Sequence, residues 1–147
     1  MHLDALPKTS VEVLAYLCSK VRESFTVRQI ANGIGKDYRI TYEMTMRLVS
    51  DGVIAAEKRR PVTRCALKLK GNSTFFAYIE SVRASRFTAR HREIAVMASG
   101  LMDRIDSPFF SMILFDSHVK ETASKRSDLD VLFVIPGKEV EKTFHRP

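Results

Sequence analysis

The sequence predicts an α+β protein, with an N-terminal helical domain closed by a basic β-hairpin and a smaller α/β domain after it. In residues 1–70, three segments with helical spacing of apolar residues precede two β-prone segments around a basic loop. Two further helical segments and two short apolar runs of strand length follow in residues 71–147. Residues 1–70 and residues 71–147 are therefore each expected to contain both helices and strands.

The charge divides at the same place as the structure types. Residues 1–70 hold thirteen Lys or Arg against seven Asp or Glu, a net charge of +6, whereas residues 71–147 hold eleven against ten, a net charge of +1. The two values sum to the net charge of +7 for the whole chain. This distribution indicates that any binding of a polyanion belongs to the first part.

The overall composition is that of a globular chain without a membrane anchor. Its 147 residues can bury a core, and 45% hydrophobic with 28% charged residues is an ordinary soluble profile. No apolar run approaches the roughly 20 residues that span a bilayer, and the N-terminus lacks the pattern of a secretory signal. Cys18 and Cys65 lack CxxC spacing, which favours two small core residues in a reducing cytoplasm. The four histidines show no zinc-ligand spacing.

The first two helices are predicted from apolar spacing and end signals. Ser10 to Arg22 has an amphipathic pattern, with Thr9 or Ser10 as its N-cap. A short helix from Thr26 to about Asn32 follows. Two glycines within Asn32 to Gly35 break it, because glycine permits the positive φ of a tight turn between helices.

The third helix is predicted from Tyr38 to Ser50, with Asp37 as N-cap and Asp51-Gly52 as its end. Apolar residues at every fourth position are expected to face the core, and the remaining faces are expected to be more exposed. The inward set is Ile40, Met44 and Leu48. The outward set is Arg39, Thr41, Tyr42, Thr45 and Met46.

A β-hairpin with an exposed tip is predicted after the third helix. Its two β-prone segments are Val53 to Ala55 and Cys65 to Leu69, and the loop from Glu57 to Arg64 is basic and contains proline. The sequence Gly71-Asn72-Ser73 is the expected domain boundary.

Three helices, a glycine-containing turn and a basic hairpin occur here in an order that resembles the winged helix-turn-helix superfamily. In such domains the third helix enters the major groove and the hairpin lies along the phosphate backbone. The resemblance therefore implies DNA as the partner, and a homodimer on a two-fold DNA site as the assembly. The implied groove-facing residues are Arg39, Thr41, Tyr42 and Thr45. The implied phosphate-contacting residues are Lys58, Arg59, Arg60 and Arg64.

The second part begins with two predicted helices, from Phe75 to about Ser85 and from Thr88 to Ile105, the latter ended by Asp106-Ser107-Pro108. Phe109 to Phe115 is an apolar run of strand length. Val131 to Ile135 is a second apolar run of strand length. It is continuous and rich in β-branched residues, as in a strand that is covered on both faces.

A serine and an Asp-x-Asp pair lie between these two predicted strands. Asp128 and Asp130 are two residues apart, so on a strand their carboxylates project from the same face. Such a pair can hold Mg²⁺ together with substrate phosphates. Phosphoryl-type transfer often uses two such ions.

The stretch from Phe115 to Asp130 resembles the signature of DNA polymerase beta-type nucleotidyltransferases: a hydrophobic residue, Gly-Ser, ten residues and Asp-x-Asp. The resemblance implies Mg²⁺ as cofactor, a nucleoside triphosphate as ligand, and Asp128 and Asp130 as the catalytic, metal-binding pair. It also implies transfer of a nucleoside monophosphate to protein or nucleic acid, as in toxin–antitoxin systems. The implied nucleotide-binding residues are Asp116, Ser117, Arg126 and Ser127.

Three departures from this signature weaken the catalytic interpretation. Asp116 and Glu121 replace the two glycines. A carboxylate about 5 Å from a phosphate of the nucleotide repels it by about 3 kcal/mol at an effective dielectric of about 20. This repulsion lowers the affinity for the nucleotide roughly a hundredfold. Asp116 therefore either weakens the site or serves as a further metal ligand, and we favour the first. The third catalytic carboxylate of the family is also absent, because Glu139 and Glu141 come too soon after the strand. Three explanations of this missing carboxylate stay open: the natural chain continues further, a second subunit completes the fold, or the domain does no chemistry.

The sequence thus leaves three functions open. The favoured one is a DNA-binding regulatory protein whose nucleotidyltransferase-like domain is weakly active or inactive. The others are an active, Mg²⁺-dependent nucleotidyltransferase and a non-enzymatic interaction module, in which the three helices contact protein and the hairpin is merely solvated. The expected domains are a winged helix over residues 1–70, a linker helix over 71–87 and a nucleotidyltransferase-like domain over 88–147.

Overall fold

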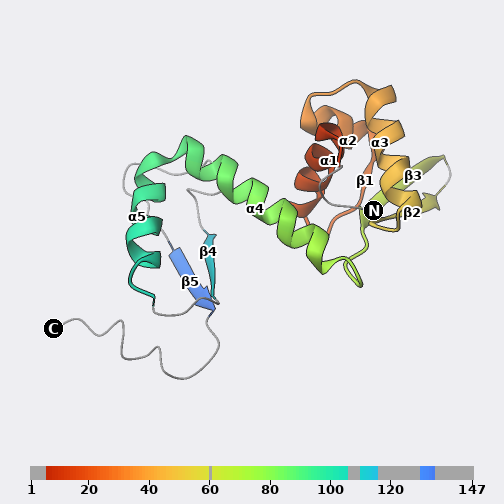
Figure 1. Cartoon of the computed structure of the whole chain (residues 1–147). Helices are drawn as coiled ribbons and strands as arrows, with labels where there is room; N and C mark the ends of the chain where they lie inside the picture. Colours follow the sequence, from red (N-terminus) through yellow and green to blue (C-terminus); the bar gives the residue numbers. More distant parts are fainter. Residues whose placement is uncertain (1–5, 60, 106–109, 116–129, 135–147) are drawn as a thin grey trace. The chain divides into compact units, whose positions relative to one another are not determined.

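The chain divides into two compact units, Met1–Arg86 and Phe87–Pro147. The structure is a computed structural model and describes residues 6–59, 61–105, 110–115 and 130–134 (Figure 1). The first unit contains α1 (Lys8–Cys18), β1 (Phe25–Thr26), α2 (Val27–Ile34), α3 (Tyr38–Ser50), β2 (Ile54–Arg59), β3 (Val62–Leu67) and most of α4 (Ser73–Arg90). The second contains the end of α4, then α5 (Arg92–Met102), β4 (Ser111–Phe115) and β5 (Asp130–Val134).

The first unit has the winged helix-turn-helix fold that the sequence predicts, within a mixed α+β chain. Three helices precede an antiparallel β2–β3 hairpin, the wing, and the short β1 adds a third strand beside β3 (Figure 1). The strand order is β1-β3-β2, with Phe25 paired to Cys65 and Arg59 paired to Val62. The wing is therefore anchored at its base to the segment that leads into α2.

The predicted N-cap of α3 is confirmed, the predicted N-cap of the first helix is wrong, and α2 has an N-cap that was not predicted from the sequence. Thr26 caps α2 in a reciprocal capping box, since its Oγ1 accepts from Gln29 N and Gln29 Oε1 accepts from Thr26 N. Asp37 caps α3 by accepting from two backbone N–H groups. The first helix instead begins after Pro7, whose fixed φ suits a helix start, so Ser10 lies inside α1 and is buried.

The two glycines of the α2–α3 turn are needed for different reasons. The helix continues through Ile34, further than predicted, and ends at Gly35, which adopts a left-handed conformation with φ of 63°. Gly33 lies against the ring of Tyr16, where a Cβ would overlap the ring carbons. Gly35 therefore supplies the turn, and Gly33 supplies the close approach between α2 and α1.

The core of the first unit is built from all its helices and the wing. Ile79 of α4 belongs to the same cluster as the residues of α1–α3. Cys18 and Cys65 are buried and free, as predicted for small core residues. The largest fully buried apolar side chains are Leu14, Leu17, Ile30, Leu48, Ile54, Ile79, Val13 and Val53.

The wing is longer and its tip shorter than the sequence predicts. Most of the expected loop from Glu57 to Arg64 is strand, and residues 60–61 alone connect the paired Arg59 and Val62. Cross-strand pairing continues to the tip because the β-branched Val62 and Thr63 can pair with the residues opposite them.

The second unit differs from expectation at its helix break and at its strands. The break lies at His91, since α4 runs on to Arg90, and α5 already ends at Met102. The two predicted strands are present and pair antiparallel, from Ser111 opposite Val134 to Phe115 opposite Asp130. One face of this hairpin is exposed, so the expected cover on both faces is wrong for the described part. Among the described residues, no helix has the length and apolar character needed to cross a membrane.

Candidate nucleic-acid interface

The third helix, α3, buries one face in the core and presents the other to solvent. Thr41, Thr45 and Leu48 are buried on the inner face. The exposed residues of the helix are Tyr38, Arg39, Ile40, Tyr42, Glu43, Arg47 and Ser50. This outer face is the surface that a winged helix can offer to a DNA groove.

The prediction that Thr41 and Thr45 face outward is wrong, as is the inward placement of Ile40. Both threonines are 0% exposed, and Ile40 is half exposed. Ile40, Met44 and Leu48 lie four positions apart, which predicted that they form the buried face of the helix. The buried face is instead formed by Thr41, Thr45 and Leu48. Thr41 Oγ1 donates to the Asp37 carbonyl at 2.8 Å, which satisfies its hydroxyl within the helix. A threonine can then occupy a core position much as valine would.

The positive N-terminal end of α3 is already neutralised by a carboxylate of the chain. Asp37 Oδ1 accepts from Arg39 N at 2.8 Å and from Ile40 N at 3.3 Å. These are two of the N–H groups that would otherwise be free to bind an anion. The exposed side chains of α3, rather than its N-terminus, are therefore what this helix can offer to a ligand.

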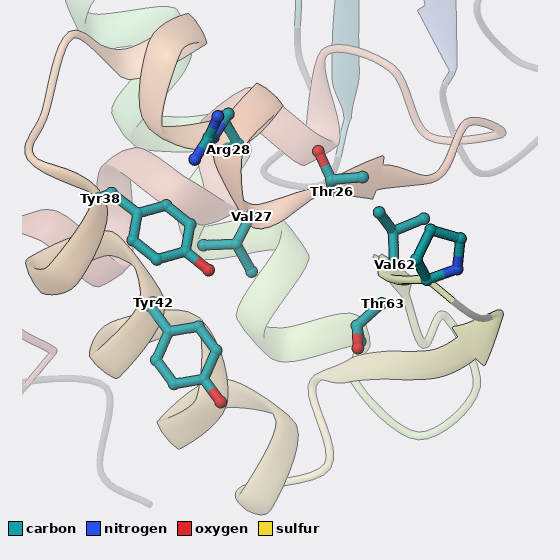
Figure 2. Close-up of a pocket in the computed structure, with 8 residues that line it drawn as sticks. Thr26, Val27, Arg28, Tyr38, Tyr42, Val62 and Thr63 are labelled. Atoms are coloured by element: carbon teal, nitrogen blue, oxygen red, sulfur yellow. The ribbon is translucent and has the colours of Figure 1, made fainter.

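Two tyrosines one turn apart form a column along one edge of the outer face. The rings of Tyr38 and Tyr42 stack with centroids 6.0 Å apart and planes 30° apart. They are 49% and 47% exposed. The guanidinium of Arg28, from α2, lies 6.0 Å from the Tyr38 centroid. A cation and two aromatic faces thus meet at the start of two helices (Figure 2).

A cleft of about 440 Å³ lies between this tyrosine column and the wing. Figure 2 shows the tyrosines on one side, Val62 and Thr63 of the wing on the other, and Val27 between the two sides. The lining residues are Thr26, Val27, Arg28, Tyr38, Tyr42, Pro61, Val62 and Thr63. The walls are mainly aromatic and aliphatic, and the polar atoms are hydroxyls and one guanidinium.

The predicted phosphate-contacting residues separate into two groups. Lys58 is exposed on β2, Arg59 ends that strand, and Arg60 lies outside the described residues. Arg64 instead holds the wing in place, because it donates from Nε to Ser24 Oγ at 2.9 Å and from Nη2 to the Ser24 carbonyl at 2.8 Å. Its guanidinium therefore has a structural role on the chain itself.

The predicted nucleotidyltransferase signature falls mostly outside the described part of the chain. Asp116, Ser117, Arg126, Ser127 and Asp128 are not among the described residues. Asp130 is described: it is exposed at the start of β5 and pairs with Phe115, the last residue of β4. Within the described ranges, no group of three His, Cys, Asp or Glu could hold a metal ion.

Sequence reasoning missed three residues of the outer surface. Arg28 carries no motif, because its placement depends on how α2 meets α3. Tyr38 could have been found from its i, i+4 spacing to Tyr42, which places the two rings on one side of a helix. Arg47 lies one turn beyond Glu43 on the exposed face and was hidden by the wrong assignment of the inward stripe.

Comparison with solved structures finds several proteins that are similar to this chain at low identity. A MarR family transcriptional regulator from Silicibacter pomeroyi is 19% identical, with a TM-score of 0.49 over 65% of each chain. The YusO protein from Bacillus subtilis is 20% identical, with a TM-score of 0.45 over 67% of this chain and 75% of that one. Sso10a-2, a DNA-binding protein from Sulfolobus solfataricus, is 14% identical, with a TM-score of 0.41 over 58% and 93%. No family model and no curated protein matches the chain.

Proposed function

We propose that the chain is a DNA-binding regulatory protein that inserts the outer face of α3 into the major groove and lays the wing along the phosphate backbone. The outer face of α3 carries this proposal: it places Arg39, Tyr42 and Arg47 in solvent on a helix that the rest of the domain supports from behind. Arginine is the residue that most often reads guanine edges, through a bidentate contact. Glu43 on the same face can accept from a cytosine amino group.

The charge of the first 70 residues supports a polyanionic partner. Their net charge of +6 is nearly the whole +7 of the chain. Lys58, Arg59 and Arg60 follow one another in the sequence at the end of β2, and we propose that they contact phosphates without reading sequence. Arg64 leaves this set, because its guanidinium is bound to Ser24.

Salt dependence of binding tests the wing. Three phosphate contacts predict a log–log slope of affinity against salt of about −2.7, from about −0.9 per contact. Affinity for a random duplex of about 20 base pairs is measured by fluorescence anisotropy at several salt concentrations. The slope should become shallower by about 2.7 in a Lys58→Ala/Arg59→Ala/Arg60→Ala variant. A Lys8→Ala/Lys20→Ala/Lys70→Ala variant removes the same charge elsewhere and should keep most of the slope. Equal slopes for the two variants would remove the wing from the interface.

Groove contact by α3 has a separate test. Arg39→Ala and Arg47→Ala should each weaken binding to a selected duplex, by about 1–3 kcal/mol for a residue that makes a bidentate base contact. Thr41→Val and Thr45→Val, on the buried face of the same helix, should leave DNA affinity within about twofold. A larger loss from the threonine variants than from the arginine variants would reject this orientation of α3.

We further propose that the chain forms a homodimer on a two-fold DNA site. We also propose a cytoplasmic location, in keeping with the two free thiols.

For residues 88–147 we propose a nucleotidyltransferase-like domain that is weakly active or inactive, with Mg²⁺-dependent transfer of a nucleoside monophosphate as the alternative. The supporting observation is that Asp130 is exposed and faces the end of β4 across the hairpin, so the two ends of the signature lie side by side. Asp128 and Asp130 would hold the metal, with Asp116, Ser117, Arg126 and Ser127 near the nucleotide.

Calorimetry with ATP, with and without Mg²⁺, separates these two proposals. Mg²⁺-dependent heat that disappears in Asp128→Ala/Asp130→Ala supports the active alternative. An absence of binding at millimolar nucleotide supports an inactive domain. An Asp116→Gly variant, which restores the glycine of the signature, should raise nucleotide affinity up to a hundredfold if the Asp116 carboxylate is what weakens the site.

A further inference from the structure

We propose that the cleft between α3 and the wing is a subsite for one unpaired nucleobase of the bound DNA. This inference rests on the proposed function, because it places the base on the same face that would contact the duplex. It adds a structural preference: the protein favours DNA that already contains an unpaired base over fully paired duplex of the same sequence.

The walls of the cleft have the chemistry of a base-stacking site. The rings of Tyr38 and Tyr42 form one wall and remain about half exposed, although burying them would remove a large apolar area from water. Val62 of the wing lies on the opposite side, with Val27 between the two (Figure 2), and Pro61 also lines the cleft. A planar ring between an aromatic and an aliphatic wall makes sequence-tolerant contacts on both of its faces.

The polar groups of the cleft suit a base better than a phosphate. Both helix N-termini beside it are capped, α2 by Thr26 with Gln29 and α3 by the Asp37 carboxylate. At α3 two backbone N–H groups are therefore taken and a carboxylate stands where an anion would bind, and at α2 the N–H group of Gln29 is taken by Thr26 Oγ1. Arg28, whose guanidinium lies over the ring of Tyr38 at 6.0 Å from its centroid, is the cation of the lining. It can hold the phosphate of the nucleotide whose base enters the cleft.

The size of the cleft is enough for about one nucleotide. A volume of about 440 Å³ lies in the lower part of the range for small-molecule sites. A base within an intact duplex reaches such a site only after it is unpaired and unstacked, which costs free energy that a mismatched or unpaired base does not require. The cleft therefore discriminates by base-pairing state.

The test compares two labelled DNAs of one sequence, a full duplex and a duplex with a central bubble of about three unpaired bases, by anisotropy at physiological salt. The wild-type chain should bind the bubble about tenfold more tightly than the duplex. Tyr38→Leu/Tyr42→Leu should reduce this ratio to about one, and Tyr38→Phe/Tyr42→Phe should keep it, because phenylalanine retains the ring. Arg39→Ala should weaken both DNAs and leave the ratio unchanged.

A probe in the DNA gives a second readout that needs no variant protein. A 2-aminopurine in the bubble should lose fluorescence when the wild-type chain binds, since stacking on a tyrosine quenches it. Equal affinity for bubble and duplex, unchanged 2-aminopurine emission, or a preference that survives in the leucine variant would each overturn the subsite while leaving duplex binding intact. Absence of binding to either DNA would overturn the proposed function itself.

Discussion

The two compact units of the chain differ in how much apolar surface their described elements bury. In the first unit, side chains from α1, α2, α3, α4 and the wing meet in one core, with Leu14 and Ile30 fully buried. Among the described residues of the second unit, the buried apolar side chains are Ile94 and Ala98, while Val96 is 67% exposed. Because burial stabilises by about 25 cal/mol per Å², the described part of the first unit gains far more from its core. Such a core supports α3 from behind along its buried face.

The two units also differ in how many features of the sequence favour the observed structure. In the first unit, helix caps, glycine turns and a dense core all favour the same arrangement, which is why the side chains of α3 have a defined inner and outer face. In the second unit, the hairpin and α5 each keep an apolar surface in solvent. The following predictions test that contrast, beginning with the largest effect.

The first prediction compares a core residue with an exposed one. Leu14→Ala should lower the free energy of unfolding of the first unit by about 3 kcal/mol, because it removes a fully buried side chain and leaves a cavity. Val96→Ala in the second unit should change stability by less than about 0.5 kcal/mol. Urea denaturation followed by circular dichroism, with hydrogen exchange to assign the change to α1–α3, measures both. Equal effects would contradict the contrast between the units.

The second prediction uses the thiols, both of which belong to the first unit. Burial raises the pKa of Cys18 from 9.0 to about 11, with a smaller contribution from the Glu80 carboxylate, and burial also raises the pKa of Cys65. The folded chain therefore retains protons that the unfolded chain releases, so stability is full below pH 9 and falls as the pH rises toward 11. For Cys18 the loss is at most about 2.7 kcal/mol, from about 1.36 kcal/mol per unit of pKa.

A Cys18→Ala variant is the control for this pH dependence. Its stability should fall less steeply than that of the wild type between about pH 8.5 and 10.5, because one of the two raised thiols is gone. Native Cys18 should also react with iodoacetamide far more slowly than in urea. Parallel stability curves for the two proteins would show that the Cys18 thiol ionises as readily in the folded chain as in the unfolded one.

Local signals in the sequence were sufficient for most of the first unit. Asp37 fixed the start of α3 because a side-chain oxygen at that position satisfies free N–H groups, and the order of helices and hairpin gave the winged fold. The inner face of α3 was not predictable from hydrophobicity, because two threonines occupy it while Ile40 faces solvent. Arg64 was assigned to phosphate because its partner Ser24 lies 40 positions away in the chain, and β1–β3 pairing alone brings them together.

The third prediction concerns the two buried threonines, which should respond with opposite signs. Thr45 Oγ1 is buried and has no hydrogen-bond partner among the described residues, whereas Thr41 Oγ1 donates to the Asp37 carbonyl. Thr45→Val should therefore stabilise the chain by about 1 kcal/mol, because it removes an unsatisfied hydroxyl without changing the volume. Thr41→Val should destabilise it by about 0.5–1.5 kcal/mol. Thermal denaturation of both variants gives the comparison, and a loss from both would mean that Thr45 finds a partner.

The smallest expected effect, that of Ile113→Thr, tests the exposed face of the β4–β5 hairpin. Ile113 and Leu114 are neighbours in β4 with opposite orientation, Ile113 being exposed and Leu114 half buried. Ile113→Thr should change stability by less than about 0.5 kcal/mol, since threonine suits a strand and little burial is lost. Leu114→Thr should cost more, about 1–2 kcal/mol, because it removes covered apolar surface and brings a hydroxyl into it.

The ranking of these two variants decides what the hairpin surface is. If Leu114→Thr costs more, the outer face is solvated in the folded chain, and its apolar residues contribute little to stability. If Ile113→Thr costs as much or more, that face is covered in solution, and the contrast between the two units is smaller than the described residues indicate. Repeating both measurements at several protein concentrations separates cover by the chain itself from cover by a second copy, because only cover by a second copy makes the cost of Ile113→Thr depend on concentration.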